Sequence, residues 1–366
     1  MDMKKFTDSE LIILLGAGAS CDAGILNSEQ MISRIEKKLS DNDWRKFKEL
    51  YHYIKSVHYQ KQIFKGVNPT NVGFNIEDLV SLLDIIVGIS KSEIDTYTFV
   101  GSWEKDLQPF ITKQRESNLV SDFKESIIKE LRGDWLMPSE WKSKSGYYKK
   151  LIDFKNELSG FPLKIFTLNY DLCVEQNLKE EYTELGFDEF DKWSFRRYDY
   201  GDTNSEISFY LYKLHGSINW QKTKDEQLIK TEGDIKTDDL AIIFGISNKL
   251  QSYDPYLFYF YEFREHCLAA NLIICSGYGF FDNHINDVIK QGLKDNPKKR
   301  LVVNVFEKKE NEKIKEEIAD ILKIQTNQIV VFNKKAIEFF NNDLKLDKFS
   351  ELFPEDETDI SLPTNF

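Results

Sequence analysis

Cysteine is scarce in this sequence, and the few that occur are scattered as Cys21, Cys173, Cys267 and Cys275, with no Cys-x-x-Cys pair. A structural zinc module is usually built from such pairs, so we expect no zinc and no other metal. A disulfide framework is also disfavoured, because such frameworks belong to small secreted chains and this chain has 366 residues. We therefore expect a reduced, cytoplasmic protein.

Long apolar runs are absent too. No stretch approaches the roughly 20 residues that a membrane helix needs, and residues 1–5 lead into the first expected strand without the features of a signal peptide. Basic residues are outnumbered, with 49 Lys and Arg against 61 Asp and Glu and a net charge of −12. Proteins that bind nucleic acid usually carry a basic surface, so direct nucleic-acid binding is not expected. Because no apolar run is long enough, membrane association is not expected either.

Glycine is sparse, yet several stand together directly after the apolar run Leu11–Leu15. A short apolar run ended by glycine is typical of a strand buried on both faces. Glycines in such a turn allow close approach of a ligand, and the amides of the turn attract phosphate. The third glycine of the usual dinucleotide fingerprint is missing, so a tight turn without a ligand is the alternative. The candidate ligand contacts here are Gly16, Ala17, Gly18 and Ser20.

Two kinds of periodicity divide the chain. Residues 28–159 show helical spacing of apolar residues without a strong strand signal, which predicts an inserted all-helical small domain. After Leu163, strand and helix patterns alternate, which predicts an α/β, Rossmann-like parallel sheet with helices on both faces. We expect that domain to combine residues 1–27 and 160–340, and residues 341–366 to form a C-terminal tail. The strands expected after the insertion are 163–168, 208–214, 240–244, 272–275, 300–306 and 328–332.

Polar residues gather just after these strands. Asn169, His215 and Gly277 each follow one of them, and the carboxyl ends of parallel strands form the edge where ligands bind. Taken singly, each has an ordinary alternative: His215 as a satisfied structural group, and Asn169 with its neighbours as a turn or cap. Two further candidates are Asp171, as a ligand or loop contact or equally a helix cap, and Tyr278, through backbone amides and a ring face. The default for Asp282 is a helix cap, and the histidines read as ordinary are His52, His58, His266 and His284.

The ordered set of glycine turn, Asn169-Tyr170-Asp171, His215-Gly216 and Gly277-Tyr278-Gly279 resembles the sirtuin family. It looks most like the sirtuin-like domains of bacterial anti-phage defence systems, which destroy NAD, and residues 75–78 fit that branch as well. The resemblance implies that the glycine turn holds the NAD phosphates. It also implies that Asn169 and His215 flank the nicotinamide ribose and are the catalytic residues of an NAD+ glycohydrolase. The partners implied are further copies of the chain, as a homo-oligomer, and a HerA-type ATPase.

Departures from the family pattern bear on the substrate. Deacylating sirtuins carry two Cys-x-x-Cys pairs beside the acyl-lysine groove and continue from the glycine turn into Gly-Ile-Pro-Asp-Phe-Arg, whereas Gly24-Ile25 here leads into Leu26-Asn27. Both differences disfavour a peptide substrate and leave an NAD-dependent protein deacylase as the alternative. A non-catalytic nucleotide-sensing scaffold is a second alternative. A dehydrogenase is more distant, because no acidic ribose reader follows a second strand.

Overall fold

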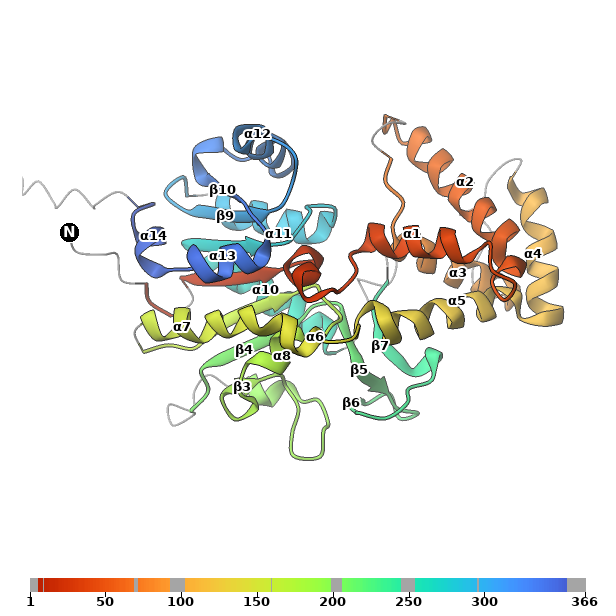
Figure 1. The fold of residues 1–366 in the computed structure, drawn as a ribbon, viewed down its shortest axis with the longest axis horizontal. Helices are drawn as coiled ribbons and strands as arrows, with labels where there is room; N and C mark the ends of the chain where they lie inside the picture. The colour runs from red at the N-terminus through yellow and green to blue at the C-terminus, as the bar shows by residue number, and fades with distance from the viewer. Residues whose placement is uncertain are drawn as a thin grey trace, which may run out of the picture.

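The computed structural model describes residues 6–8, 10–68, 72–92, 103–158, 160–198, 206–244, 254–294 and 296–353. Its centre is a seven-stranded sheet in the order β10-β9-β8-β1-β2-β4-β3, in which all neighbouring strands run parallel (Figure 1). Because the chain leaves β1 for β2 on one side and later crosses to β8 on the other, the order reverses beside β1. The strands are β1 Leu11–Leu15, β2 Leu163–Thr167, β3 Thr183–Glu184, β4 Phe209–Lys213, β8 Leu272–Ser276, β9 Arg300–Val305 and β10 Ile329–Asn333.

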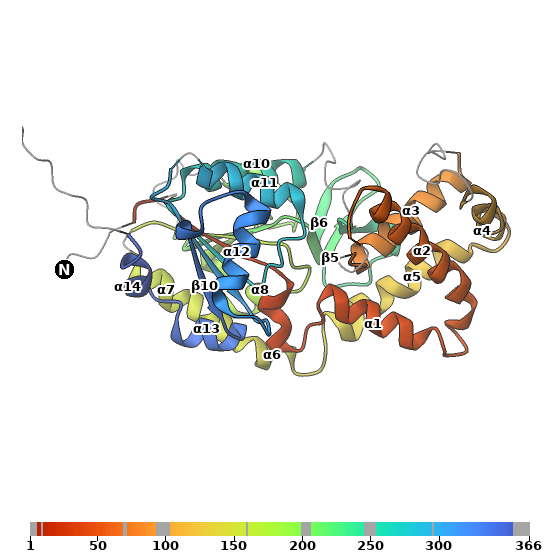
Figure 2. The same ribbon diagram turned by 90° about the horizontal axis from the view of Figure 1, so that it is seen from above.

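Helices cover both faces of this sheet, which confirms the predicted fold class. Successive β1 side chains alternate between two cores: Ile13 packs in one and Ile12 and Leu14 in the other. Figure 2 shows α10 and α11 on one side of the sheet and α7 and α13 on the opposite side. These covering helices, with α12, are α7 Lys150–Glu157, α10 Tyr256–Ala269, α11 Asn283–Lys294, α12 Asn311–Leu322 and α13 Ala336–Asn342.

The described residues of the segment between β1 and β2 form helices joined by turns and loops, with no strand among them. Helices α1 to α5 form a lobe beside the sheet (Figures 1 and 2). The last part of the segment contacts the turn after β1 instead, since the hydroxyl of Tyr147 donates to the carbonyl of Ala19 at 2.5 Å. The helices before α7 are α1 Ser28–Lys38, α2 Lys48–Phe64, α3 Ile76–Ser90, α4 Trp103–Ser117, α5 Leu119–Glu130 and α6 Trp141–Lys144, and the short 3-10 helix η6, Ser145–Lys149, follows them.

One expected strand lies in a different sheet. Residues 240–244 were expected in the parallel sheet, but Leu240–Ile242 forms β7 in a separate three-stranded sheet of order β6-β5-β7. The chain reverses at Gly216, whose φ of +82° suits glycine, and continues directly into β5, Gly216–Lys222. Strand β5 then pairs antiparallel with β7 and with β6, Leu228–Lys230.

The C-terminal boundary expected at residue 341 falls inside α13, which runs to Asn342. A further helix, α14, spans Leu346–Ser350, and Phe349 is fully buried against the edge of Phe154 at a ring-centroid distance of 5.9 Å. Part of the expected tail therefore completes one face of the sheet, because its apolar side chains have a place to pack. The acidic stretch from Pro354 onward lies outside the described residues. No helix in the ranges given above is long and apolar enough to cross a membrane.

Phenol groups buried over the sheet make stability sensitive to alkali. Tyr198 stacks on Tyr212 at 4.9 Å and its hydroxyl lies 3.3 Å from that of Tyr259. Burial, and next the charge of Tyr259, raises the pKa of Tyr198 well above its usual value. The folded state therefore favours the neutral phenol, so this contribution to stability is complete below the unfolded pKa of about 10 and is lost as pH rises above it.

We predict that the free energy of unfolding falls between pH 10 and 11, at a limiting slope of about 1.4 kcal/mol per pH unit for each such phenol. Urea titrations followed by circular dichroism from pH 8 to 11 measure this fall. Tyr198→Phe is expected to make it shallower. Tyr261→Phe is the control, because Tyr261 is an exposed residue of α10. Parallel curves for wild type and Tyr198→Phe would contradict the assignment.

Candidate functional site

The glycine turn packs directly on the loop after β8. The amide of Gly16 donates to the carbonyl of Ser276 and that of Gly18 to the carbonyl of Gly277, both at 2.9 Å. A Cβ on Gly16 would lie 2.6 Å from the Gly277 carbonyl oxygen, and one on Gly277 would lie 1.9 Å from the amide of Ala19. The two backbones therefore touch with no room for a side chain between them, at the point where the strand order reverses.

This contact shows that glycine is required at these positions by the packing of two backbones. We expected the amides of Gly16 and Gly18 to face a phosphate, but they donate to Ser276, the last residue of β8, and to Gly277 in the loop after it. A side chain at Gly18 would first meet the Cα of Gly277, 2.9 Å away, rather than a ligand. Ala17 and Gly18 remain partly exposed, whereas Ser20 is fully buried with its Oγ 3.0 Å from the Tyr148 hydroxyl.

Asn169 and His215 occupy equivalent positions on neighbouring strands. Thr167 of β2 pairs with Lys213 of β4, and each candidate lies two residues beyond its strand's paired residue. Parallel strands are about 4.8 Å apart, so both side chains start from the same edge of the sheet. Nδ2 of Asn169 donates to the carbonyl of Gly16 at 3.0 Å and to Oγ of Ser20 at 3.2 Å. Its Oδ1 is buried and has no hydrogen-bond partner among the described residues.

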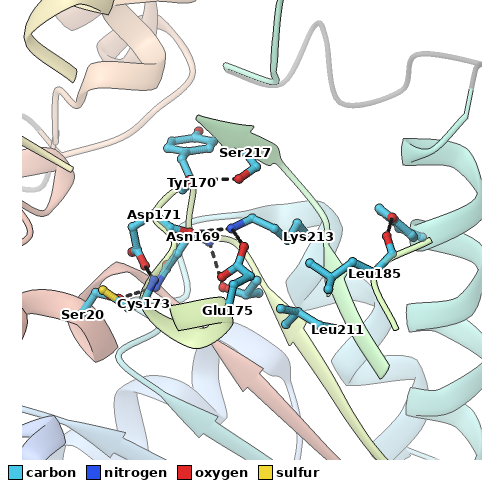
Figure 3. Close-up of polar contacts among 12 residues, drawn as sticks. Ser20, Asn169, Tyr170, Asp171, Cys173, Glu175, Leu185, Leu211, Lys213 and Ser217 are labelled. Atoms are coloured by element: carbon cyan, nitrogen blue, oxygen red, sulfur yellow. Dashed lines mark hydrogen bonds and ion pairs between the residues drawn. The ribbon is translucent and has the colours of Figure 1, made fainter. Parts of the chain in front are cut away.

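A buried lysine, Lys213, binds the loop that carries Asn169 (Figure 3). Nζ of Lys213 donates to the carbonyl of Asp171 at 2.5 Å and pairs with Glu175 at 2.7 Å. The carboxylate of Asp171 accepts a hydrogen bond at 2.9 Å from the amide of Cys173, the first residue of the short helix α8, Cys173–Asn177. A contact between Asp171 and a ligand stays a prediction. Burial, and next the charge of Asp171, raises the pKa of the Cys173 thiol well above its usual value.

His215 lies at a pocket beside the same edge. Its Nε2 is 3.4 Å from Oδ2 of Asp282, and the two side chains are 6% and 8% exposed. Its Nδ1 is buried and has no hydrogen-bond partner in the described ranges. The pocket has an empty volume of about 360 Å³, which includes open solvent at its mouth. Its lining residues are Leu214, His215, Ile243, Tyr256, Phe260, Asp282, His284 and Ile285.

Asp282, which we expected to be a helix cap, and His284, which we interpreted as ordinary, lie at this pocket. Asp282 does cap α11, through the amide of His284 at 3.0 Å, but its other oxygen faces His215. His284 and Tyr256 line the pocket as well. For Asp282 and His284 the available signal was their position just after β8, at the same edge as Gly277. Within the described part of the chain, no three His, Cys, Asp or Glu residues are grouped as a metal site.

Tyr278 is tied into the core rather than into the pocket. Its hydroxyl donates to Oδ1 of Asn286 at 2.7 Å, its ring lies 4.7 Å from that of Phe280, and 5% of the residue is exposed. Burial, and next the charge of Asp282, raises the pKa of Tyr278 well above its usual value. The ring face of Tyr278 is buried and not open to a ligand. The partly exposed residue next to it is Gly277.

The fold and site define a doubly covered parallel α/β protein with a glycine turn at the point where the strand order reverses. Residues 163–329, which include Asn169, His215 and Gly277, match the family model described as SIR2-like domain. This match supports the expected resemblance over residues 163–329, which are less than half of the chain. No curated protein matches the chain.

Solved structures with similarity to the chain include complexes of Sir2 proteins. A mutant Sir2 homologue bound to 2'-O-acetyl ADP-ribose is 11% identical, with 97% of this chain and 94% of that chain covered and a TM-score of 0.44. A Sir2 homologue bound to NAD is 10% identical, with 96% of each chain covered and a TM-score of 0.43.

The loop contact predicts a sharp difference between two nearby glycines. Gly277→Ala would force a Cβ into the backbone of Ala19 at a residue with φ of +67°. We expect it to lower the free energy of unfolding by about 3 kcal/mol or more. Gly279→Ala is the control, because its Cβ would meet only the ring of the exposed Phe281, and we expect a loss below about 1 kcal/mol. Equal melting temperatures for the two variants would refute the packing argument.

Proposed function

We propose that the protein is an NAD+ hydrolase, which cleaves the nicotinamide–ribose bond with water to give nicotinamide and ADP-ribose. One observation carries the proposal: Asn169 Oδ1 and His215 Nδ1 are buried atoms without hydrogen-bond partners in the described structure. Buried polar atoms normally have partners, so two such atoms at equivalent positions of adjacent strand ends are typical of a site that a ligand completes. The SIR2-like match, which includes both residues, supports NAD as that ligand.

The residue types suit this chemistry. Cleavage passes through a transition state with oxocarbenium character, and nicotinamide leaves as a neutral group, so no strong acid is needed. His215 acts as the base that takes a proton from the attacking water or a ribose hydroxyl, because a neutral imidazole has one ring nitrogen with a free lone pair. Asn169 orients the ribose and water, since an amide offers donor and acceptor without charge.

The dinucleotide lies along the carboxyl edge of the sheet in this proposal. The phosphates of NAD reach the partly exposed residues Ala17 and Gly18 of the glycine turn, and Gly277 of the loop after β8. Three further candidates support this surface through contacts within the protein: Ser20, Asp171 and Tyr278. Oγ of Ser20 accepts a hydrogen bond from Asn169, and Asp171 accepts one from the first amide of α8. Tyr278 is bonded to Asn286 and so fixes the loop after β8.

An NAD-dependent protein deacylase is the alternative, and a non-catalytic nucleotide-sensing scaffold is the second. Purified protein incubated with NAD alone separates the three. A hydrolase releases nicotinamide and ADP-ribose without a peptide, a deacylase requires an acylated peptide, and a scaffold binds NAD without turnover.

The cellular role we infer is depletion of NAD in bacterial anti-phage defence, in the cytoplasm. This inference rests on the sirtuin-like resemblance of the motifs. A hydrolase of NAD would harm its own cell if it were always active, so we infer that it is controlled by assembly. The assembly we propose is a homo-oligomer that associates with a HerA-type ATPase.

We predict that His215→Ala lowers nicotinamide release by about two to four orders of magnitude, the usual effect of losing a general base. Asn169→Ala is expected to lose a comparable factor, because the ribose and water are no longer oriented. It is also expected to lose about 1 kcal/mol of stability, since it removes the bonds to Gly16 and Ser20.

Turnover by chromatography, NAD affinity by calorimetry and melting temperature are measured on the same preparations. His52→Ala is the control, because His52 is an exposed residue of α2. His215→Ala should melt and bind NAD as wild type does. A stable His215→Ala protein with undiminished NAD cleavage would end this proposal.

Assembly gives a separate prediction. Light scattering of the purified chain is expected to show a mass that is a multiple of the 43.0 kDa monomer. Activity per chain is expected to rise with concentration as the oligomer forms. A strict monomer that is fully active at every concentration would contradict control by assembly and leave the hydrolase assignment intact.

A further inference from the structure

His215 is held on one side by a carboxylate whose position is fixed. Oδ2 of Asp282 lies 3.4 Å from Nε2 of His215, and both side chains are almost fully buried. Oδ1 of Asp282 accepts a hydrogen bond from the amide of His284 at 3.0 Å. The carboxylate therefore cannot rotate freely. The 3.4 Å contact is long for a hydrogen bond, but such contacts in ligand-free sites commonly tighten when substrate binds.

The two ring nitrogens of His215 consequently differ. A carboxylate beside Nε2 favours a proton on that atom, because only an N–H can donate to it, and the lone pair of a neutral ring then lies on Nδ1. Nδ1 is the buried ring atom without a hydrogen-bond partner in the described structure. We propose that Asp282 is a positioning residue that keeps the His215 proton on Nε2, so that Nδ1 is the atom that accepts the proton during NAD cleavage.

This inference rests on the proposed function and specifies its proton transfer. Nδ1 takes one proton from the attacking water as the new C–O bond forms at the ribose carbon and the bond to nicotinamide breaks. The resulting imidazolium carries N–H on both nitrogens and is stabilised by the charge of Asp282. The proton is then released to solvent, which balances the reaction of NAD+ and water to nicotinamide, ADP-ribose and one proton.

Other titratable groups face His215 without offering the same contact. The ring of Tyr170 lies 6.3 Å from that of His215 between centroids, and Tyr256 and His284 line the shared pocket. Glu77 lies behind Tyr170, 3.3 Å from its hydroxyl. Burial, and next Glu77, raises the pKa of Tyr170 well above its usual value, so that phenol stays neutral at working pH. Asp282 is thus the carboxylate that contacts the ring.

The geometry makes Asp282→Asn a specific test. The amide of His284 needs an acceptor, so the one oxygen of the substituted side chain is retained there and its NH2 group faces His215. An NH2 group can only donate, so Nε2 has to accept and the ring proton moves to Nδ1, where it blocks the base. We expect nicotinamide release to fall by about two to four orders of magnitude in kcat, with KM nearly unchanged. The control Asp287→Asn, at an exposed position of α11, should leave both constants unchanged.

The tautomer is read directly by ¹⁵N NMR of histidine-labelled protein without NAD, at a pH where the ring is neutral. The His215 signals are assigned by their loss in His215→Gln. We expect Nε2–H in wild type and Nδ1–H in Asp282→Asn. A wild-type proton on Nδ1 overturns the inference even if the variant fails to fold, and so does an active Asp282→Asn with the wild-type tautomer. If wild type does not cleave NAD, the proposed function fails, while the spectra still decide the role of Asp282.

Discussion

The site depends on a backbone contact that contains no side chain. The amides of Gly16 and Gly18 in the turn after β1 donate to the carbonyls of Ser276 and Gly277, and Gly277 adopts a φ of +67° at this contact. Asn169 is anchored on the carbonyl of Gly16, so its position depends on the same contact. Tyr147 and Tyr148 reach the other side of the turn, through Ala19 and Ser20. The turn is therefore fixed from the sheet, from the neighbouring loop and from η6 before any ligand arrives.

A second constraint is electrostatic. Lys213 is 1% exposed, and its ammonium group holds both Glu175 and the carbonyl of Asp171. Desolvating a buried ion pair costs about as much as its attraction returns, so this pair contributes little net stability. Its effect is on position, because the lysine comes from β4 and its partners follow β2. The pair thus ties the Asn169 loop to the strand that leads to His215.

Sequence reasoning predicted what depends on local pattern. Apolar runs such as Leu11–Leu15 are strands, and parallel strands bring their carboxyl ends to one edge, so the strand-end positions of Asn169, His215 and Gly277 could be predicted. The sheet that takes Leu240–Ile242 could not, because an apolar run does not specify its pairing partner and β5 starts without a break after the Gly216 turn. The pairing of Asp282 with His215 was also missed. Its cap role is readable from local sequence, whereas the second contact exists only in the folded chain.

The helical lobe is also connected to the site. Tyr170, the residue after Asn169, has one hydroxyl proton and lies between two acceptors, the carbonyl of Ile243 at 3.0 Å and Glu77 at 3.3 Å. Glu77 belongs to the first turn of α3, where a capping box between Asn75 and Asp78 fixes the start of the helix. Acceptors from the lobe and from the segment just after β7 therefore face the same phenol. Since Tyr170 and Asn169 share one peptide unit, the packing of the lobe bears directly on the backbone that positions Asn169.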